Sequence, residues 1–137
     1  MTIENKKTLI YILIAFIFSI AVRLIWVYQF DGLEQYKFND QFMINTNDGY
    51  FWAEGARDIV SGVSQENDLS PVGDASSILT AIIAKIVPFS FESVILYMPA
   101  FFASLVVIPS ILIARSLGKL EVGFIAALLG SIAWSYT

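Results

Sequence analysis

Hydrophobic residues are grouped into three long runs, separated by polar segments of very different length. The first run covers residues 8–28 and contains one charged residue, Arg23. The second run covers residues 93–114, the third covers residues 122–137, and neither contains a charged side chain. An α-helix needs about 20 apolar residues, rising ~1.5 Å each, to cross the ~30 Å hydrocarbon core of a bilayer. The pattern therefore predicts three transmembrane helices in an all-α membrane protein.

A cleavable signal peptide is the alternative interpretation of the first run. Two lysines precede the run, and Ser19-Ile20-Ala21 has the small-x-small pattern of a cleavage site. The apolar residues continue past that site to Tyr28, which favours an uncleaved helical anchor. Arg23 lies near the far end of this helix, where a long side chain can extend to the membrane interface.

The basic residues beside the runs predict the orientation of the chain. Lys6 and Lys7 flank the first run, whereas Arg115 and Lys119 lie in the short connection between the second and third runs. The positive-inside rule places both groups on the cytoplasmic side of the membrane. The N-terminus is then cytoplasmic, and residues 29–92 form a loop on the opposite side.

This external loop, residues 29–92, is long, acidic and partly helical. Loops beyond ~15 residues without secondary structure are uncommon and usually functional. Apolar residues within 49–61 recur at helical spacing, with Asp48 at the expected N-cap and Gly62 at the expected C-cap. Residues 76–91 are apolar but interrupted by a lysine and a proline, which predicts one or two helices at the membrane surface.

The composition agrees with lipid as the solvent and excludes several kinds of chemistry. Hydrophobic residues make up 57% of the chain and charged residues 15%, whereas soluble proteins average about 25% charged. A chain of 137 residues cannot bury that much apolar surface in its own core. Cysteine and histidine are absent, which excludes disulfides, Cys/His zinc sites and Ser-His-Asp triads. The net charge of −4 provides no basic surface for nucleic acid.

Asp48 is the strongest candidate for chemistry. A carboxylate in a polar turn at the start of a helix can coordinate a hard divalent cation such as Mg²⁺ or Mn²⁺. A helix cap explains Asn-Asp-Gly before an apolar-periodic run equally well. Glu54, Arg57 and Asp58 share one face of the same helix, where Glu54 and Arg57 have the spacing of a weak exposed ion pair.

Several segments are similar, in their order and spacing, to the N-terminal segments of one enzyme family. These segments are Phe38-Asn39-Asp40-Gln41, Asn47-Asp48-Gly49-Tyr50, Ala53-Glu54-Gly55-Ala56-Arg57-Asp58, Asn67-Asp68-Leu69-Ser70, Pro88-Phe89-Ser90-Phe91-Glu92-Ser93 and the start of the third run. In them the chain resembles the bacterial single-subunit oligosaccharyltransferases (PglB type), and the similarity extends over essentially all 137 residues.

The resemblance implies the N-terminal part of a C-type glycosyltransferase fold in the inner (plasma) membrane of a bacterium, with the first loop in the periplasm. The family transfers a glycan from a polyprenyl-pyrophosphate-linked oligosaccharide to the asparagine of Asn-X-Ser/Thr in an acceptor polypeptide. Asp48 matches the family's first-loop aspartate, which binds Mg²⁺ or Mn²⁺ and contacts the acceptor amide. The resemblance thus implies that Asp48 is both a catalytic residue and a metal ligand.

Other parts of the family's machinery have no counterpart in these residues. A second acidic motif, a later glutamate-bearing loop and a Trp-Trp-Asp motif are absent, so we expect an N-terminal fragment that is inactive by itself. Two alternatives remain: a fragment of another C-type glycosyltransferase, such as an aminoarabinose or O-mannosyl transferase, and a non-enzymatic three-span membrane subunit. The segments at 53–58 and 88–93 favour the oligosaccharyltransferase.

Overall fold

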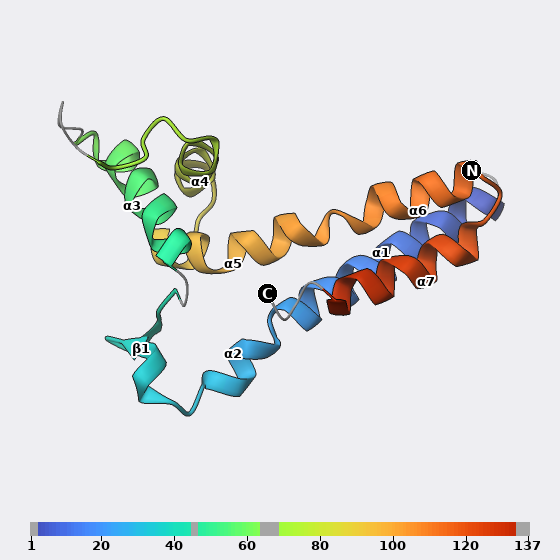
Figure 1. The fold of residues 1–137 in the computed structure, drawn as a ribbon, viewed down its shortest axis with the longest axis horizontal. Coiled ribbons are helices and arrows are strands. Elements are labelled where there is room, and N and C mark those ends of the chain that lie inside the picture. The colour runs from blue at the N-terminus through green and yellow to red at the C-terminus, as the bar shows by residue number, and fades with distance from the viewer. Residues whose placement is uncertain (1–2, 45–46, 64–68, 134–137) are drawn as a thin grey trace. The chain divides into compact units, whose positions relative to one another are not determined.

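The computed structural model describes residues 3–44, 47–63 and 69–133, and the chain divides into two compact units. One unit combines Met1–Asp31 with Ala100–Thr137, and the other is Gly32–Pro99. Helices dominate both units, as the sequence predicts (Figure 1).

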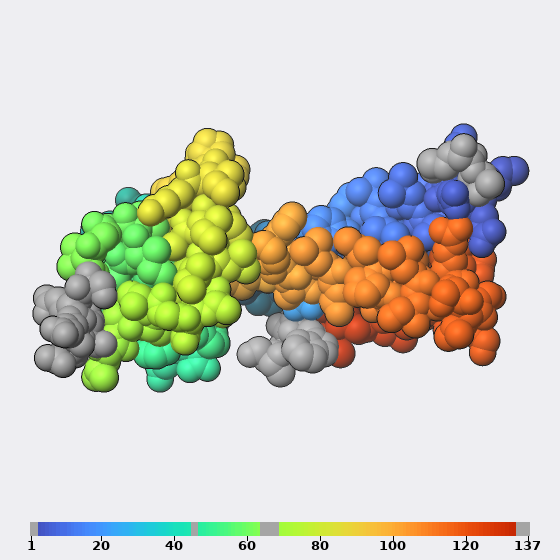
Figure 2. Space-filling model, turned by 90° about the horizontal axis from the view of Figure 1, so that it is seen from above, coloured from blue at the N-terminus to red at the C-terminus, as the bar shows by residue number. Residues whose placement is uncertain are grey.

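The first unit is a helical bundle in which α1, α6 and α7 pack against one another (Figure 1). Its elements are α1 (Ile3–Arg23), α2 (Ile25–Phe30), the end of α5 (Phe91–Ser104), α6 (Val107–Ser116) and α7 (Leu120–Ala133). In the space-filling view, blue α1 lies directly against orange α6 (Figure 2). Ala15, Val107 and Ile111 are fully buried in the core between these helices. Beside them the ring of Tyr11 stacks on that of Phe124, with centroids 4.4 Å apart.

Two helical segments are long and apolar enough to cross a membrane. They are Ile3–Phe30 and Phe91–Ser116, of 28 and 26 residues, and they contain the first two predicted spans. The third predicted span, residues 122–137, is described only as far as residue 133. There α7 has 14 residues, which corresponds to ~21 Å of helix. The count of three spans therefore stays a prediction.

The second predicted span, residues 93–114, is divided into two helices. Helix α5 ends at Ser104 and α6 begins at Val107. Proline has no N–H, so Pro109 cannot donate to the carbonyl of Leu105, four residues earlier. The N–H of Ile108 donates to that carbonyl instead, at 3.0 Å, in a tighter turn. The helix is therefore broken just before Pro109, between α5 and α6.

Polar side chains from α1, α6 and α7 meet at one end of the bundle. The Lys7 ammonium lies 2.5 Å from the Glu121 carboxylate, and its hydrogen bond lowers the pKa of that carboxyl. The guanidinium of Arg115 lies 3.6 Å from Glu4 and donates to the side-chain oxygen of Asn5 at 2.5 Å. Exposed pairs of this kind add little stability. These pairs place Lys7, from the N-terminal segment, and Arg115, from the connection between the second and third apolar runs, at the same end of the bundle. Both segments are predicted to be cytoplasmic.

The second unit contains most of the predicted external loop. Its elements are η1 (Glu34–Tyr36), β1 (Lys37–Phe38), β2 (Gln41–Phe42), α3 (Asn47–Ser61), α4 (Ala75–Ile86) and the first part of α5. The helix predicted within residues 49–61 is confirmed as α3. The apolar stretch 76–91 contains all of α4 except its first residue, Ala75, and reaches the start of α5 at its last residue. Helix α4 ends where Val87 adopts an extended backbone, because the residue before a proline disfavours the helical conformation.

We expect Gly123→Ala to destabilise the contact between α6 and α7 by about 1–3 kcal/mol, the usual cost of overpacking a core. A Cβ at Gly123 would collide with the Cβ of Ala114 and lie 3.3 Å from the Cα of Ile111. Unfolding in detergent mixtures, followed by far-ultraviolet circular dichroism, measures the change. Gly130→Ala on the same helix is the control, because a Cβ there meets nothing within 4 Å. Equal effects of the two substitutions would contradict this account of the packing.

Candidate functional site

Asp48 lies on helix α3, in its first turn. The helix begins at Asn47, so the sequence-based placement of Asp48 at the N-cap is wrong by a residue or two, a common uncertainty at helix ends. A carboxylate in the first turn still interacts favourably with the positive end of the helix dipole. The residue is exposed, and its side chain makes no hydrogen bond or ion pair with any residue in 3–44, 47–63 or 69–133. Its carboxylate oxygens are thus accessible to a ligand.

The other end of α3 has the geometry that the sequence predicts. Gly62 follows the last helical residue with φ +70°, a left-handed conformation that glycine adopts without a side-chain clash. The N–H of Val63 donates to the carbonyl of Asp58 at 3.2 Å. This bond is typical of a Schellman motif, so the predicted C-cap is confirmed.

Helix α3 is held by close packing against α4 and the segment before it. Ala53 and Ala56 are buried on the face of α3 that contacts α4. A Cβ on Gly55 would lie 2.7 Å from the carbonyl oxygen of Pro71, so only glycine allows this approach. From α4, Ser77 donates its hydroxyl to the carbonyl of Trp52 at 3.1 Å. These contacts set the direction of the helix that carries Asp48.

A two-stranded hairpin lies next to α3 along the chain. Strands β1 and β2 are antiparallel, with Lys37 opposite Phe42 and Phe38 opposite Gln41. The two turn residues, Asn39 and Asp40, have φ values of 49° and 63°. Two positive values in a two-residue loop are typical of a type I′ turn, for which asparagine and aspartate are well suited. The Asn-Asp pair between Phe38 and Gln41 was the signal for this hairpin, which our sequence analysis missed.

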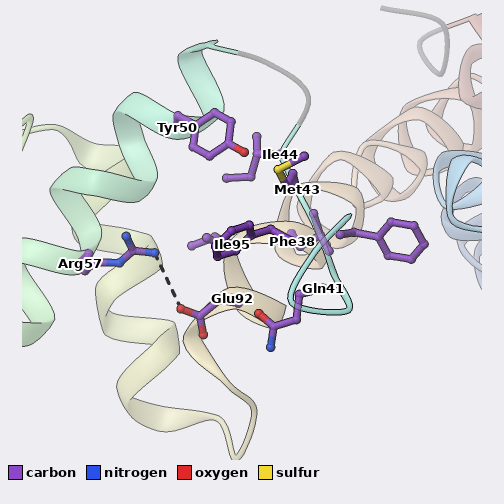
Figure 3. A pocket seen from close by; sticks show the side chains of 10 residues that line it. Phe38, Gln41, Met43, Ile44, Tyr50, Arg57, Glu92 and Ile95 are labelled. Carbon is purple, nitrogen blue, oxygen red and sulfur yellow. Dashed lines mark ion pairs between the residues drawn. The ribbon is translucent and has the colours of Figure 1, made fainter. Parts of the chain in front are cut away.

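A cavity of about 200 Å³ lies between this hairpin, α3 and the start of α5 (Figure 3). Its lining is mainly apolar and aromatic, and includes Phe38, Phe42, Met43, Ile44, Tyr50, Ile95 and Leu96. Arg57 points toward Glu92, and their charged atoms are 3.7 Å apart (Figure 3). The same guanidinium lies over the ring of Phe91, 5.4 Å from its centroid. The ion pair suggested by the spacing of Glu54 and Arg57 is therefore wrong, because Arg57 pairs with Glu92 instead.

The residues that the structure describes do not form a metal centre around Asp48. Within residues 3–44, 47–63 and 69–133, no three acidic side chains are grouped closely enough to hold an ion. Asp48 does not line the cavity, although Tyr50, two residues later on α3, does. For Mg²⁺ or Mn²⁺, Asp48 thus provides an oxygen donor of the right chemistry, but the described residues do not group three such ligands around an ion.

Comparisons with known proteins agree with the resemblance seen in the sequence. The family model described as "Oligosaccharyl transferase STT3, N-terminal" matches residues 1–137. The chain is 51% identical over 125 residues to the undecaprenyl-diphosphooligosaccharide–protein glycotransferase of Campylobacter jejuni strain RM1221. It is 52% identical over 125 residues to the protein of the same name from C. jejuni serotype O:2. Each alignment covers 91% of this chain and 18% of the relative.

We expect Gly55→Ala to loosen α3 from α4, because the added Cβ would lie 2.6–2.8 Å from atoms of Ser77 and Pro71. Hydrogen exchange measured by mass spectrometry should show faster exchange in both helices of the variant. The matched control is Gly73→Ala, since a Cβ at Gly73 meets nothing within 4 Å. Unchanged exchange in Gly55→Ala would show that the close approach is not needed to hold α3.

Proposed function

Because the chain belongs to the oligosaccharyl transferase STT3 family, we propose that it forms the N-terminal part of an oligosaccharyltransferase. The observation that carries the proposal is the 51% and 52% identity to two proteins named as glycotransferases. The chain spans 18% of the length of these relatives, so the transfer is proposed for a protein of their full extent. The same identity favours this function over another glycosyltransferase or a non-enzymatic subunit.

The proposed reaction moves a glycan from a polyprenyl-pyrophosphate carrier to the side-chain amide of asparagine in an Asn-X-Ser/Thr acceptor. An amide nitrogen is a weak nucleophile because its lone pair is delocalised into the carbonyl group. A carboxylate that accepts a hydrogen bond from the amide N–H polarises that nitrogen, and such interactions are worth most where water is excluded. In a single displacement the nitrogen attacks the anomeric carbon, the carrier leaves as its pyrophosphate, and the configuration at that carbon is inverted. The amide N–H that donates to the carboxylate gives up its proton to that group.

Asp48 is the residue of this chain that we assign to the acceptor amide and to a divalent metal. The support is its match to the family's first-loop aspartate and its exposed carboxylate, which has no partner among the described residues. Carboxylate oxygens are preferred ligands of Mg²⁺ and Mn²⁺. When bound, such an ion would supply positive charge that orients the carboxylates around the amide. Its remaining ligands are proposed to come from segments of the enzyme outside these residues.

The chain is a membrane protein, which both its two long apolar helices and its relatives indicate. We propose further that the polar end with Lys7 and Arg115 faces the cytoplasm of a bacterium, and that the unit with Asp48 lies in the periplasm. In this orientation Asp48 is on the side where the glycan would be transferred.

The role of Asp48 can be tested in a chimera. This chain would replace the matching segment of the C. jejuni serotype O:2 relative, and glycosylation of an Asn-X-Ser/Thr reporter would be measured by its shift in gel mobility. We expect Asp48→Asn to lower the yield of glycosylated reporter at least ~100-fold, in the range for a lost transition-state hydrogen bond. Glu54→Gln is the matched control, because it neutralises another exposed carboxylate on the same helix.

The assignment of Asp48 is wrong if Asp48→Asn and Glu54→Gln transfer glycan equally well. An inactive chimera with the unsubstituted chain, produced at normal levels, would instead count against the proposed function itself.

The orientation can be tested with single cysteines, because the chain has none of its own. We expect Gly32→Cys in intact spheroplasts to react with a membrane-impermeant maleimide, since that residue is the first of the unit assigned to the periplasm and is exposed. Leu117→Cys, in the exposed turn between α6 and α7, should react only after the membrane is permeabilised. Labelling in the reverse order would refute the orientation.

A further inference from the structure

Arg23 is a cation of the helical bundle without a partner among the described residues. It lies in the last turn of α1, and its Nε atom is buried without a hydrogen-bond partner. No carboxylate among residues 3–44, 47–63 and 69–133 forms an ion pair with it. A buried polar group without a partner is costly, and a charged one within a membrane nearly always has a counter-charge. An anion from outside the described residues would remove this cost.

The polar cluster of the bundle is too distant to supply that anion. Arg23 is 16 residues after Lys7 on the same helix, which places it ~24 Å further along the axis. Lys7 and Arg115 already pair with Glu121 and Glu4 at the other end. Measured from that end, the Arg23 side chain lies close to the far boundary of a ~30 Å hydrocarbon core.

Arg23 lines a groove of about 350 Å³ on the bundle. Phe102 and Val106 line the same groove with apolar side chains, while Ala126 and Gly130 of α7 keep it open. A Cβ on Gly130 would meet nothing within 4 Å, whereas one on Gly123 of the same helix would collide with α6. The small residues Ala126 and Gly130 are therefore exposed and do not pack against a neighbouring helix among the described residues.

We propose that this groove binds a membrane phospholipid, with the lipid phosphate on Arg23 and the upper part of an acyl chain beside Phe102 and Val106. The groove has one cationic group and otherwise mainly apolar walls, which complements an anionic amphiphile. Headgroup phosphates are found at the membrane boundary, the depth that Arg23 reaches. This proposal does not depend on the proposed transfer activity.

The test uses the full chain with Trp26 as its single tryptophan, after Trp52→Phe and Trp134→Phe. Trp26 is three residues after Arg23, about one helical turn away. The protein is reconstituted in phosphatidylcholine vesicles that contain brominated phosphatidylglycerol or brominated phosphatidylcholine, and the quenching of tryptophan fluorescence gives their relative affinities. We expect phosphatidylglycerol to be preferred about five-fold, the selectivity that one basic residue near an anionic surface typically confers.

Arg23→Gln should abolish the preference, and Arg23→Lys, which restores the charge, should recover most of it. Lys85→Gln is the matched control: it removes one positive charge from α4, in the other unit, and should leave the preference unchanged. Gly130→Leu keeps Arg23 but fills the groove, and should weaken the binding of both lipids. Circular dichroism verifies that each variant is folded, and Arg23→Lys and Gly130→Leu test the proposal if Arg23→Gln does not fold.

Three results would overturn the proposal. The first is equal quenching by the two lipids in the protein that retains Arg23. The second is a preference for phosphatidylglycerol that persists in Arg23→Gln. The third is quenching unaffected by Gly130→Leu, which would show that the lipid does not occupy the groove.

Discussion

The first unit depends on one constraint: within lipid, each backbone N–H and C=O must find its partner inside the protein. The apolar segments therefore form helices, and several of their hydroxyl groups bond to the same backbone. Thr8, Ser104 and Ser131 each donate to the carbonyl four residues earlier, at 2.9, 2.7 and 2.7 Å. Where Pro109 removes an N–H, the chain breaks into α5 and α6 and tightens its turn so that the carbonyl of Leu105 is still paired. The membrane thus determines the secondary structure here more strongly than contacts between helices, whose shared core is small.

The second unit is organised by close packing instead. Gly55 allows the backbone around Pro71 to approach α3 directly, and Ser77 bonds to the carbonyl of Trp52 across the same contact. The rigid part of α3 is therefore its middle, while its first turn presents Asp48 to solvent. The role proposed for Asp48 needs this combination, because the helix that carries the carboxylate must be held by packing while its oxygens remain available. A single carboxylate would be only part of the metal site that we propose, and the chain spans 18% of the length of its relatives.

Charged side chains are used differently at the two ends of the bundle. At one end Lys7 and Arg115 are paired with carboxylates of the same chain, so their charges need nothing further. At the other end the buried Nε of Arg23 has no partner among the described residues and faces a groove. Burial makes an unpaired charge costly, whereas an exposed one is solvated at little cost. The difference identifies Arg23, rather than the paired residues, as the place where the bundle accepts a group from its surroundings.

The sequence alone determined the features that depend on neighbours along the chain: the apolar helices, the helix at 49–61 and the glycine cap at Gly62. It also indicated the family, and with it the match between Asp48 and the family's first-loop aspartate. Only the tertiary structure showed that Arg57 pairs with Glu92 rather than Glu54, and that α7 leaves a groove beside Arg23. Helical periodicity, caps and family motifs are set by residues a few positions apart, so they can be recognised in a linear pattern. Ion pairs and cavities involve residues tens of positions apart in the sequence, and each charged residue has several possible partners. The packing of the helices decides which partner is close enough.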